Sequence, residues 1–128
     1  MHRRNTFNGL IKLEKIDLHK NQLQKIEIVI FKNLLNLRKI DLSKNQLQFI
    51  DKDTYKSLVN LREINLSGNK LRNIEKKTFS GLVNLKVISL TNNQLQSINK
   101  NKFNDLLNLE DIQLNYNELE SIDDDTFE

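Results

Sequence analysis

The sequence predicts an α/β solenoid, in which stacked coils share one core and carry a short parallel β-sheet on one side and irregular or 3₁₀ turns on the other. Two observations predict this fold class. Apolar columns recur with a period of 24 residues along the chain of 128 residues. Each period also contains one short stretch in which apolar and polar residues alternate, as they do in a half-buried strand.

The period divides one domain into units, and every unit from residue 13 onward begins with a leucine that follows a polar residue. The units are a partial unit at 1–12, repeats at 13–36, 37–60, 61–84 and 85–108, and an incomplete repeat at 109–128. Leu10 and Phe127 leave apolar columns uncovered at the ends, and solenoids need polar caps. We therefore expect a fragment of a longer protein; the alternative is that the polar residues at each end serve as minimal covers.

The first element of each complete unit is a short strand. Ile40, Asp41 and Leu42 alternate apolar and polar residues, and the equivalent positions of the other units keep this alternation. A strand this short cannot stand alone. Strands that stack one period apart can form a parallel sheet with neighbours ~4.8 Å apart, while the rest of each unit returns across the other side of the core.

A column of asparagines follows the strand in every unit. It lies between two apolar columns, so we expect each amide to point inward and bond to the backbone of adjacent coils. We therefore predict that this column stabilises the fold and does not form a ligand-binding site. The column consists of Asn21, Asn45, Asn69, Asn93 and Asn117.

An aromatic column forms the opposite side of each coil. Phe79 and Leu82 are three residues apart, which is consistent with a single helical or 3₁₀ turn rather than a long helix. Tyr55 stands where the other units have phenylalanine, and its hydroxyl needs a partner or an exit to water. The column consists of Phe7, Phe31, Tyr55, Phe79, Phe103 and Phe127.

The repeated pattern L-x-x-I-x-L-x-x-N-x-L-x-x-I-x-x-x-x-F-x-x-L covers about residues 7–127 and resembles the leucine-rich repeat in its 24-residue form, common in extracellular and receptor proteins. The resemblance implies a horseshoe-shaped solenoid whose parallel sheet lines a concave, protein-binding face. It also implies a non-catalytic module of a cell-surface receptor, adhesion protein or matrix protein. The chain departs from the extracellular pattern because it has no cysteine for the usual caps and no proline.

Function then falls to the variable strand residues that face water on either side of the buried isoleucines. We expect Val87, Tyr116 and Asp111 to contribute most to binding, and Ser43 to face water. The alternative is that these are merely solvated strand residues and that a partner binds elsewhere. The predicted ligand-binding residues of the concave face are Lys15, Asp17, Lys39, Asp41, Glu63, Asn65, Val87, Ser89, Asp111, Gln113 and Tyr116.

Composition excludes several other classes of function. The chain is 38% hydrophobic and 29% charged, which is typical neither of disorder nor of a membrane protein. No apolar run approaches the roughly 18 to 20 residues of a spanning helix. The net charge of +3 comes from mixed acidic and basic residues, so it is too small to indicate nucleic-acid binding.

Catalytic and metal-binding groups are sparse. His19 lies two residues from Asp17, but no serine or cysteine nucleophile is arranged with it. The acidic run Asp123–Asp125 lacks the glycine turn and closing glutamate of a calcium loop. We therefore predict no enzymatic activity, no cofactor and no metal site.

The predicted partner is a protein ligand, including one that bears a glycan, with no nucleic acid and no direct membrane insertion of this segment. The resemblance places the protein outside the cell or at its surface, with a cytoplasmic location as the alternative. Two other functions stay open. One is an intracellular scaffold or regulatory subunit, which the missing cysteine caps fit, and the other is the sensor region of an enzyme whose catalytic domain lies outside this chain.

Overall fold

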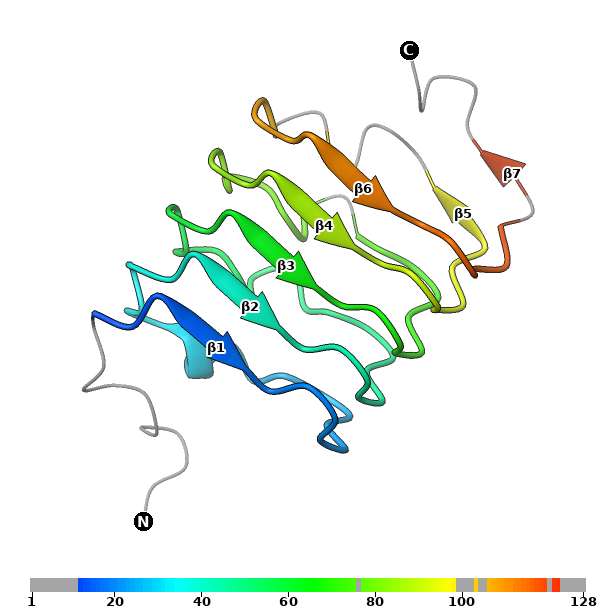
Figure 1. Ribbon diagram of the computed structural model, residues 1–128, viewed down its shortest axis with the longest axis horizontal. Helices are drawn as coiled ribbons and strands as arrows, with labels where there is room; N and C mark the ends of the chain where they lie inside the picture. The colour runs from blue at the N-terminus through cyan, green and yellow to red at the C-terminus, as the bar shows by residue number, and fades with distance from the viewer. Residues whose placement is uncertain (1–11, 76, 99–102, 104–105, 120, 123–128) are drawn as a thin grey trace.

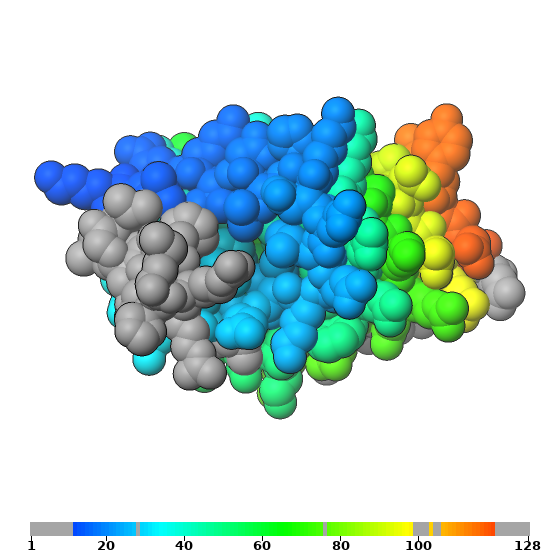
Figure 2. Space-filling view, turned by 90° about the horizontal axis from the view of Figure 1, so that it is seen from below, coloured from blue at the N-terminus to red at the C-terminus, as the bar shows by residue number. Residues whose placement is uncertain are grey.

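The computed structural model describes residues 12–75, 77–98, 103, 106–119 and 121–122. Phe7, Leu10, the acidic run Asp123–Asp125 and Phe127, which the sequence prediction used, lie outside the described residues. The described coils follow one another in chain order along the long axis of the molecule (Figure 2). Among these residues, no helix has both the length and the hydrophobicity needed to cross a membrane.

Five parallel strands lie side by side in one sheet, with the order β1-β2-β3-β4-β6 (Figure 1). Neighbouring strands are in register one period apart, so that Ile16 pairs with Ile40 and Ile88 pairs with Ile112. The predicted solenoid, with its parallel sheet on the concave face, is confirmed. The strands are β1 (Lys15–Asp17), β2 (Lys39–Asp41), β3 (Glu63–Asn65), β4 (Val87–Ser89) and β6 (Asp111–Gln113).

The return side of each coil is mostly irregular. One 3₁₀ helix, η2 (Ile28–Phe31), lies in the first described unit. The expected single turn recurs in later units, since the N–H of Leu82 donates to the carbonyl of Phe79 at 3.2 Å. The strands β5 (Ser97–Ile98) and β7 (Ser121–Ile122) form a second, two-stranded parallel sheet that the sequence did not predict.

The core lies between the main sheet and the aromatic column. The rings of Phe31, Tyr55, Phe79 and Phe103 form a stack with centroids 6.1, 6.0 and 6.2 Å apart. Tyr55 is fully buried, and its hydroxyl has no hydrogen-bond partner in the described part of the chain. Burial raises the pKa of the Tyr55 hydroxyl. The expectation that this hydroxyl finds a partner or reaches water is therefore wrong.

The asparagine column ties each coil to the one before it. Oδ1 of Asn69 accepts a hydrogen bond from the N–H of Leu47 at 3.0 Å, and its Nδ2 donates to the carbonyls of Leu42 and Leu66 at 3.0 Å. Asn21, in contrast, is exposed, and its amide bonds to carbonyls of its own turn. The interlocking set of bonds recurs at Asn45, Asn93 and Asn117.

A left-handed residue follows each main strand by three positions. Its φ of about 60° turns the chain. At the first four of these positions its N–H donates to a carbonyl of the next coil, as Lys44 donates to Ser67 at 2.9 Å and Gly68 donates to Thr91 at 2.9 Å. This arrangement extends the ladder between coils beyond the strands. The left-handed column consists of Lys20, Lys44, Gly68, Asn92 and Tyr116, with φ of 57°, 57°, 69°, 59° and 59°.

Candidate functional site

The concave face consists of the outward-facing residues of the five main strands together with Tyr116. The outer strands carry exposed side chains, namely Lys15 and Asp17 on β1 and Asp111 and Gln113 on β6. The side chains of the three inner strands are half-buried by their neighbours on both sides. These half-buried residues are Lys39, Asp41, Glu63, Asn65, Val87 and Ser89.

Charged side chains on the concave face pair with one another. Nζ of Lys39 lies 3.0 Å from the Glu63 carboxylate on the adjacent strand. This hydrogen bond is the main reason that the pKa of Lys39 is raised above its usual value of 10.5. On β6, Nε2 of Gln113 donates to the Asp111 carboxylate at 3.0 Å. A partner must therefore compete with contacts that the face already makes with itself.

Two residues of the inner strands, Asp41 and Asn65, also close the turn that follows their strand. Oδ1 of Asp41 accepts from the N–H of Ser43 at 2.9 Å and from its hydroxyl at 2.6 Å. Oδ1 of Asn65 accepts from the N–H and the hydroxyl of Ser67 at 3.0 and 2.7 Å. Ser43 is only 7% exposed, so the expectation that it faces water is wrong. Its hydroxyl completes the turn instead.

Of the three residues expected to contribute most to binding, the two apolar ones, Val87 and Tyr116, differ in accessibility. Val87 was expected to be exposed, but it is half-buried, because Glu63 on β3 and Asp111 on β6 are its register partners on either side. Tyr116 is 81% exposed and belongs to the left-handed column. Tyr116 therefore offers the larger apolar surface to a partner, while Val87 contributes a smaller patch on the floor of the face.

Asp17, His19 and Asp41 form a group whose ligand atoms all lie within 4.8 Å of one another, so in the described part of the chain they could hold a metal ion. Nδ1 of His19 lies 2.5 Å from Oδ1 of Asp17, and the same oxygen accepts from the His19 N–H at 3.1 Å. The side-chain hydrogen bond from His19 is the main cause that lowers the pKa of Asp17. The imidazole and this carboxylate oxygen thus form an exposed hydrogen-bonded pair at the end of β1.

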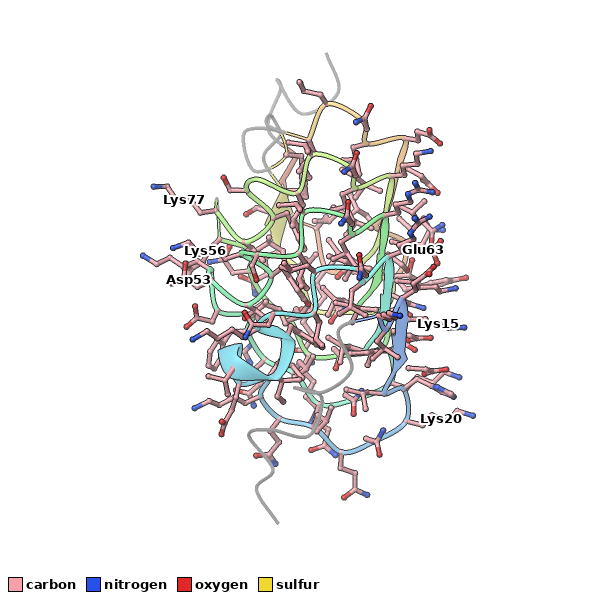
Figure 3. All side chains as sticks on the ribbon, turned by 90° about the vertical axis from the view of Figure 1, so that its left-hand side faces the viewer. Lys15, Lys20, Asp53, Lys56, Glu63 and Lys77 are labelled. Carbon is pink, nitrogen blue, oxygen red and sulfur yellow. The ribbon has the colours of Figure 1, made fainter. Side chains whose placement is uncertain are left out.

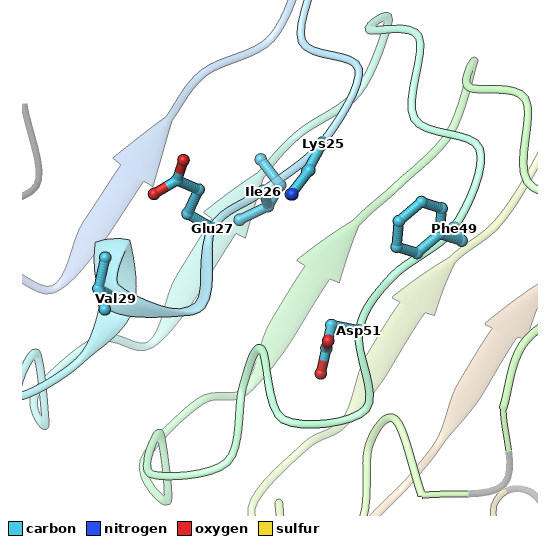
Figure 4. A pocket seen from close by; sticks show the side chains of 6 residues that line it. All are labelled: Lys25, Ile26, Glu27, Val29, Phe49 and Asp51. Atoms are coloured by element: carbon cyan, nitrogen blue, oxygen red, sulfur yellow. The ribbon is translucent and has the colours of Figure 1, made fainter.

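Phe49 marks a further surface that the sequence analysis did not single out. It is 57% exposed and lies between two hollows on the side of the coil that follows the asparagine column. One hollow, of 380 Å³, lies between Phe49 and Val29 and is lined by Lys25, Glu27 and Asp51 among others (Figure 4). The signal available in the sequence was an aromatic residue outside the aromatic column.

Comparison with known proteins agrees with this geometry. The sequence model of the BspA type leucine-rich repeat region matches residues 3–128 in 6 copies. No curated protein matches the chain. The solved leucine-rich repeat domain of APL1B is similar at 23% identity and a TM-score of 0.82, covering 96% of this chain and 39% of that chain.

Two further solved structures are similar. The leucine-rich repeat domain of APL1 has 21% identity and a TM-score of 0.87, covering 94% of this chain and 32% of that chain. The structure of the Toll–Spatzle complex of Drosophila matches at 28% identity and a TM-score of 0.79, covering 86% of this chain and 14% of that chain. This chain thus spans well under half the length of these proteins. On the family match, the chain belongs to the BspA-type leucine-rich repeat family, as the resemblance to leucine-rich repeats predicted.

Proposed function

We propose that this chain is a non-catalytic protein-binding module that contacts a protein ligand through its concave face. The observation that supports this proposal best is the register of the five main strands, which brings the variable side chains of five coils onto one continuous surface. Leucine-rich repeat domains are typically protein-interaction modules. In the Toll–Spatzle complex a similar solenoid is solved together with a protein.

The pattern of contacts on the face favours two ways of recognising a ligand. Tyr116 is the main apolar anchor, because exposed aromatic residues often dominate the binding energy of an interface. The acidic end at Asp111 and the basic end at Lys15 orient the ligand along the face. The self-paired charges between them contribute less, since a ligand has to replace the contacts they already make.

A crosslinking experiment tests the proposed face. A photoreactive amino acid replaces Gln113 on the concave face or, as a control, Lys77 on the opposite side of the solenoid (Figure 3). The concave probe should crosslink one protein from the native source, and excess unlabelled chain should compete with it. Crosslinking of the same protein from position 77 alone would contradict the proposal.

Substitutions that are compatible with the local backbone conformation then test the two apolar residues, Tyr116 and Val87. Tyr116→Asn keeps a residue type that the left-handed column already contains at Asn92, and Val87→Thr keeps a β-branched residue in the strand. Tyr116→Asn should weaken binding of the crosslinked ligand on the order of tenfold, and Val87→Thr by less. Unchanged affinity in both variants, with unchanged melting temperature, would place the ligand elsewhere.

We further propose that the full protein acts outside the cell or at its surface, as a receptor, adhesion or matrix protein. The similarity to Toll, which was solved in a glycosylated form, supports this setting. Labelling intact cells with a membrane-impermeant biotin reagent should modify the full-length protein. Labelling only after the cells are lysed would instead favour the intracellular scaffold.

A further inference from the structure

An exposed apolar ridge runs along the side of the solenoid where the return segments lead into the main strands. The leucines directly before the ridge positions are buried, and so are those two residues after them, except that Leu109 is partly buried. Leu58 and Leu61 flank Val59 in this way, so the core does not need the ridge residues. A recurrent exposed apolar column indicates an interaction surface. The ridge consists of Leu35, Val59, Val83 and Leu107, which are 47%, 47%, 47% and 86% exposed.

The backbone of the ridge is already hydrogen-bonded. The side-chain amides of Asn60, Asn84 and Asn108 donate to the carbonyls of Leu35, Val59 and Val83, at 2.8, 2.9 and 2.7 Å. The N–H groups of Val59 and Val83 donate to carbonyls of their own turns at 3.0 and 2.9 Å. A partner strand therefore finds these groups occupied, and a partner has to bind through side chains.

The charges that border the first three ridge residues are positive, whereas the exposed Glu110 borders the fourth, Leu107. The whole chain is nearly balanced, with 20 basic and 17 acidic residues, but segments 32–38, 56–62 and 80–86 contain no acidic residue. Arg62 and Lys86 form no ion pair among the described residues, and Nε of Arg38 lies 3.8 Å from the Glu14 carboxylate. The basic residues in these segments are Lys32, Arg38, Lys56, Arg62 and Lys86, and all are exposed.

We propose that this ridge is a second interaction surface, separate from the concave face, and that it binds an acidic amphipathic helix of a partner protein. Neighbouring coils are ~4.8 Å apart and one turn of helix rises about 5.4 Å. Apolar residues at i, i+4, i+7 and i+11 of a helix can therefore meet one ridge residue in each coil. Acidic residues beside three of these apolar residues meet the lysines and arginines that border Leu35, Val59 and Val83. The end of the helix near Leu107 carries no acidic residue, because Glu110 lies there.

Charge and composition favour this occupant over two others. A second copy of the chain would bring the column of Arg38, Arg62 and Lys86 against the same column, and like charges facing each other are repulsive. An anionic membrane surface is usually bound with the help of Trp or Tyr at the interface, but the ridge consists of leucine and valine alone.

A designed peptide provides the probe. It is helical, with leucine at i, i+4, i+7 and i+11 and with glutamate on both flanks of the three leucines that face Leu35, Val59 and Val83. Its binding to the full chain is measured by fluorescence anisotropy. Val59→Ser combined with Val83→Ser should weaken binding on the order of tenfold. Phe49→Ser, at an exposed apolar residue outside the ridge, is the matched control and should leave binding unchanged.

Charge-reversal variants distinguish this specific recognition from nonspecific hydrophobic binding. Arg62→Glu combined with Lys86→Glu should abolish binding of the acidic peptide and create binding of a peptide with lysines in place of its glutamates. No binding of the acidic peptide, or equal binding to the Val59→Ser, Val83→Ser variant, overturns the proposal. So does ridge-dependent binding to vesicles of phosphatidylcholine and phosphatidylserine without peptide binding, or a dimer in sedimentation that the double serine variant abolishes.

Discussion

The inner coils and the outer coils of this solenoid contain the same columns but bury them to different extents. Leu42, Leu66 and Leu90 are fully buried, whereas their equivalents Leu18 and Leu114 are only partly buried. The asparagine column shows the same contrast, because Asn69 is 7% exposed and Asn21 is exposed. A residue of the repeat thus contributes to stability in proportion to the neighbours of its coil.

The largest test of this contrast removes a leucine side chain. Leu66→Ala leaves a cavity between two neighbouring coils and should lower the free energy of unfolding by about 2 to 5 kcal/mol. Leu114→Ala should cost about half as much, because that side chain is already partly exposed. Guanidinium unfolding followed by circular dichroism measures both, and equal losses would refute the contrast.

The asparagine column gives the next largest effect. Asn69→Ala leaves the N–H of Leu47 and the carbonyls of Leu42 and Leu66 without their amide partner, at an expected cost of about 1 to 3 kcal/mol. Asn21→Ala, at an exposed amide, should change stability by no more than about 0.5 kcal/mol. Thermal unfolding gives the melting temperatures of both variants. A similar fall in the two would mean that the hydrogen bonds between coils do not account for the loss of stability.

A stabilising substitution addresses the buried hydroxyl of an inner coil. Tyr55→Phe keeps the ring in the aromatic stack and removes a hydroxyl that has no partner among the described residues, so stability should rise by about 1 kcal/mol. Tyr116→Phe, at a residue that is 81% exposed, is the control and should have no measurable effect. Thermal unfolding of both variants tests this expectation. A lower melting temperature of Tyr55→Phe would show that the Tyr55 hydroxyl has a hydrogen-bond partner.

The smallest effect concerns the outer strand β1. The folded-state pKa of Asp17 lies below its usual value of 3.8, mainly because His19 hydrogen-bonds to it. The contribution of this pair to stability is therefore present above pH 3.8 and is lost as the pH falls through the lowered pKa. His19→Ala should move the Asp17 midpoint up toward 3.8 in a carbon-13 NMR titration, and an unmoved midpoint would show that another group lowers it.

The main sheet could be predicted from the sequence because its requirements repeat. Ile40, Leu42 and Asn45 recur at the same positions of every complete unit, and only stacking one period apart buries them all. The pairing of β5 with β7 could not be predicted in the same way. The isoleucine column indicates that Ile98 is buried, but burial does not reveal whether the backbone on either side of it pairs with the next coil.

The candidate site was harder to predict because a position whose residue varies among the units is not always exposed to water. Ser43 varies among the units and so was expected to face water, yet its hydroxyl bonds to Asp41 within a closed turn. The ridge could not be recognised from the sequence for the opposite reason. A recurring apolar column is typical of a buried core, and only the structure shows that Val59 and Val83 are exposed. The assignment of ligand binding to the concave face stays a prediction.

The left-handed column limits how the concave face could be redesigned for new ligands. Position 87 lies in a strand and accepts β-branched residues, but position 116 has a φ of 59°, which valine, isoleucine and threonine adopt only with strain. Glycine and asparagine already occupy equivalent positions at Gly68 and Asn92. A combinatorial library therefore needs a different set of amino acids at the end of each strand from the set it uses within the strand.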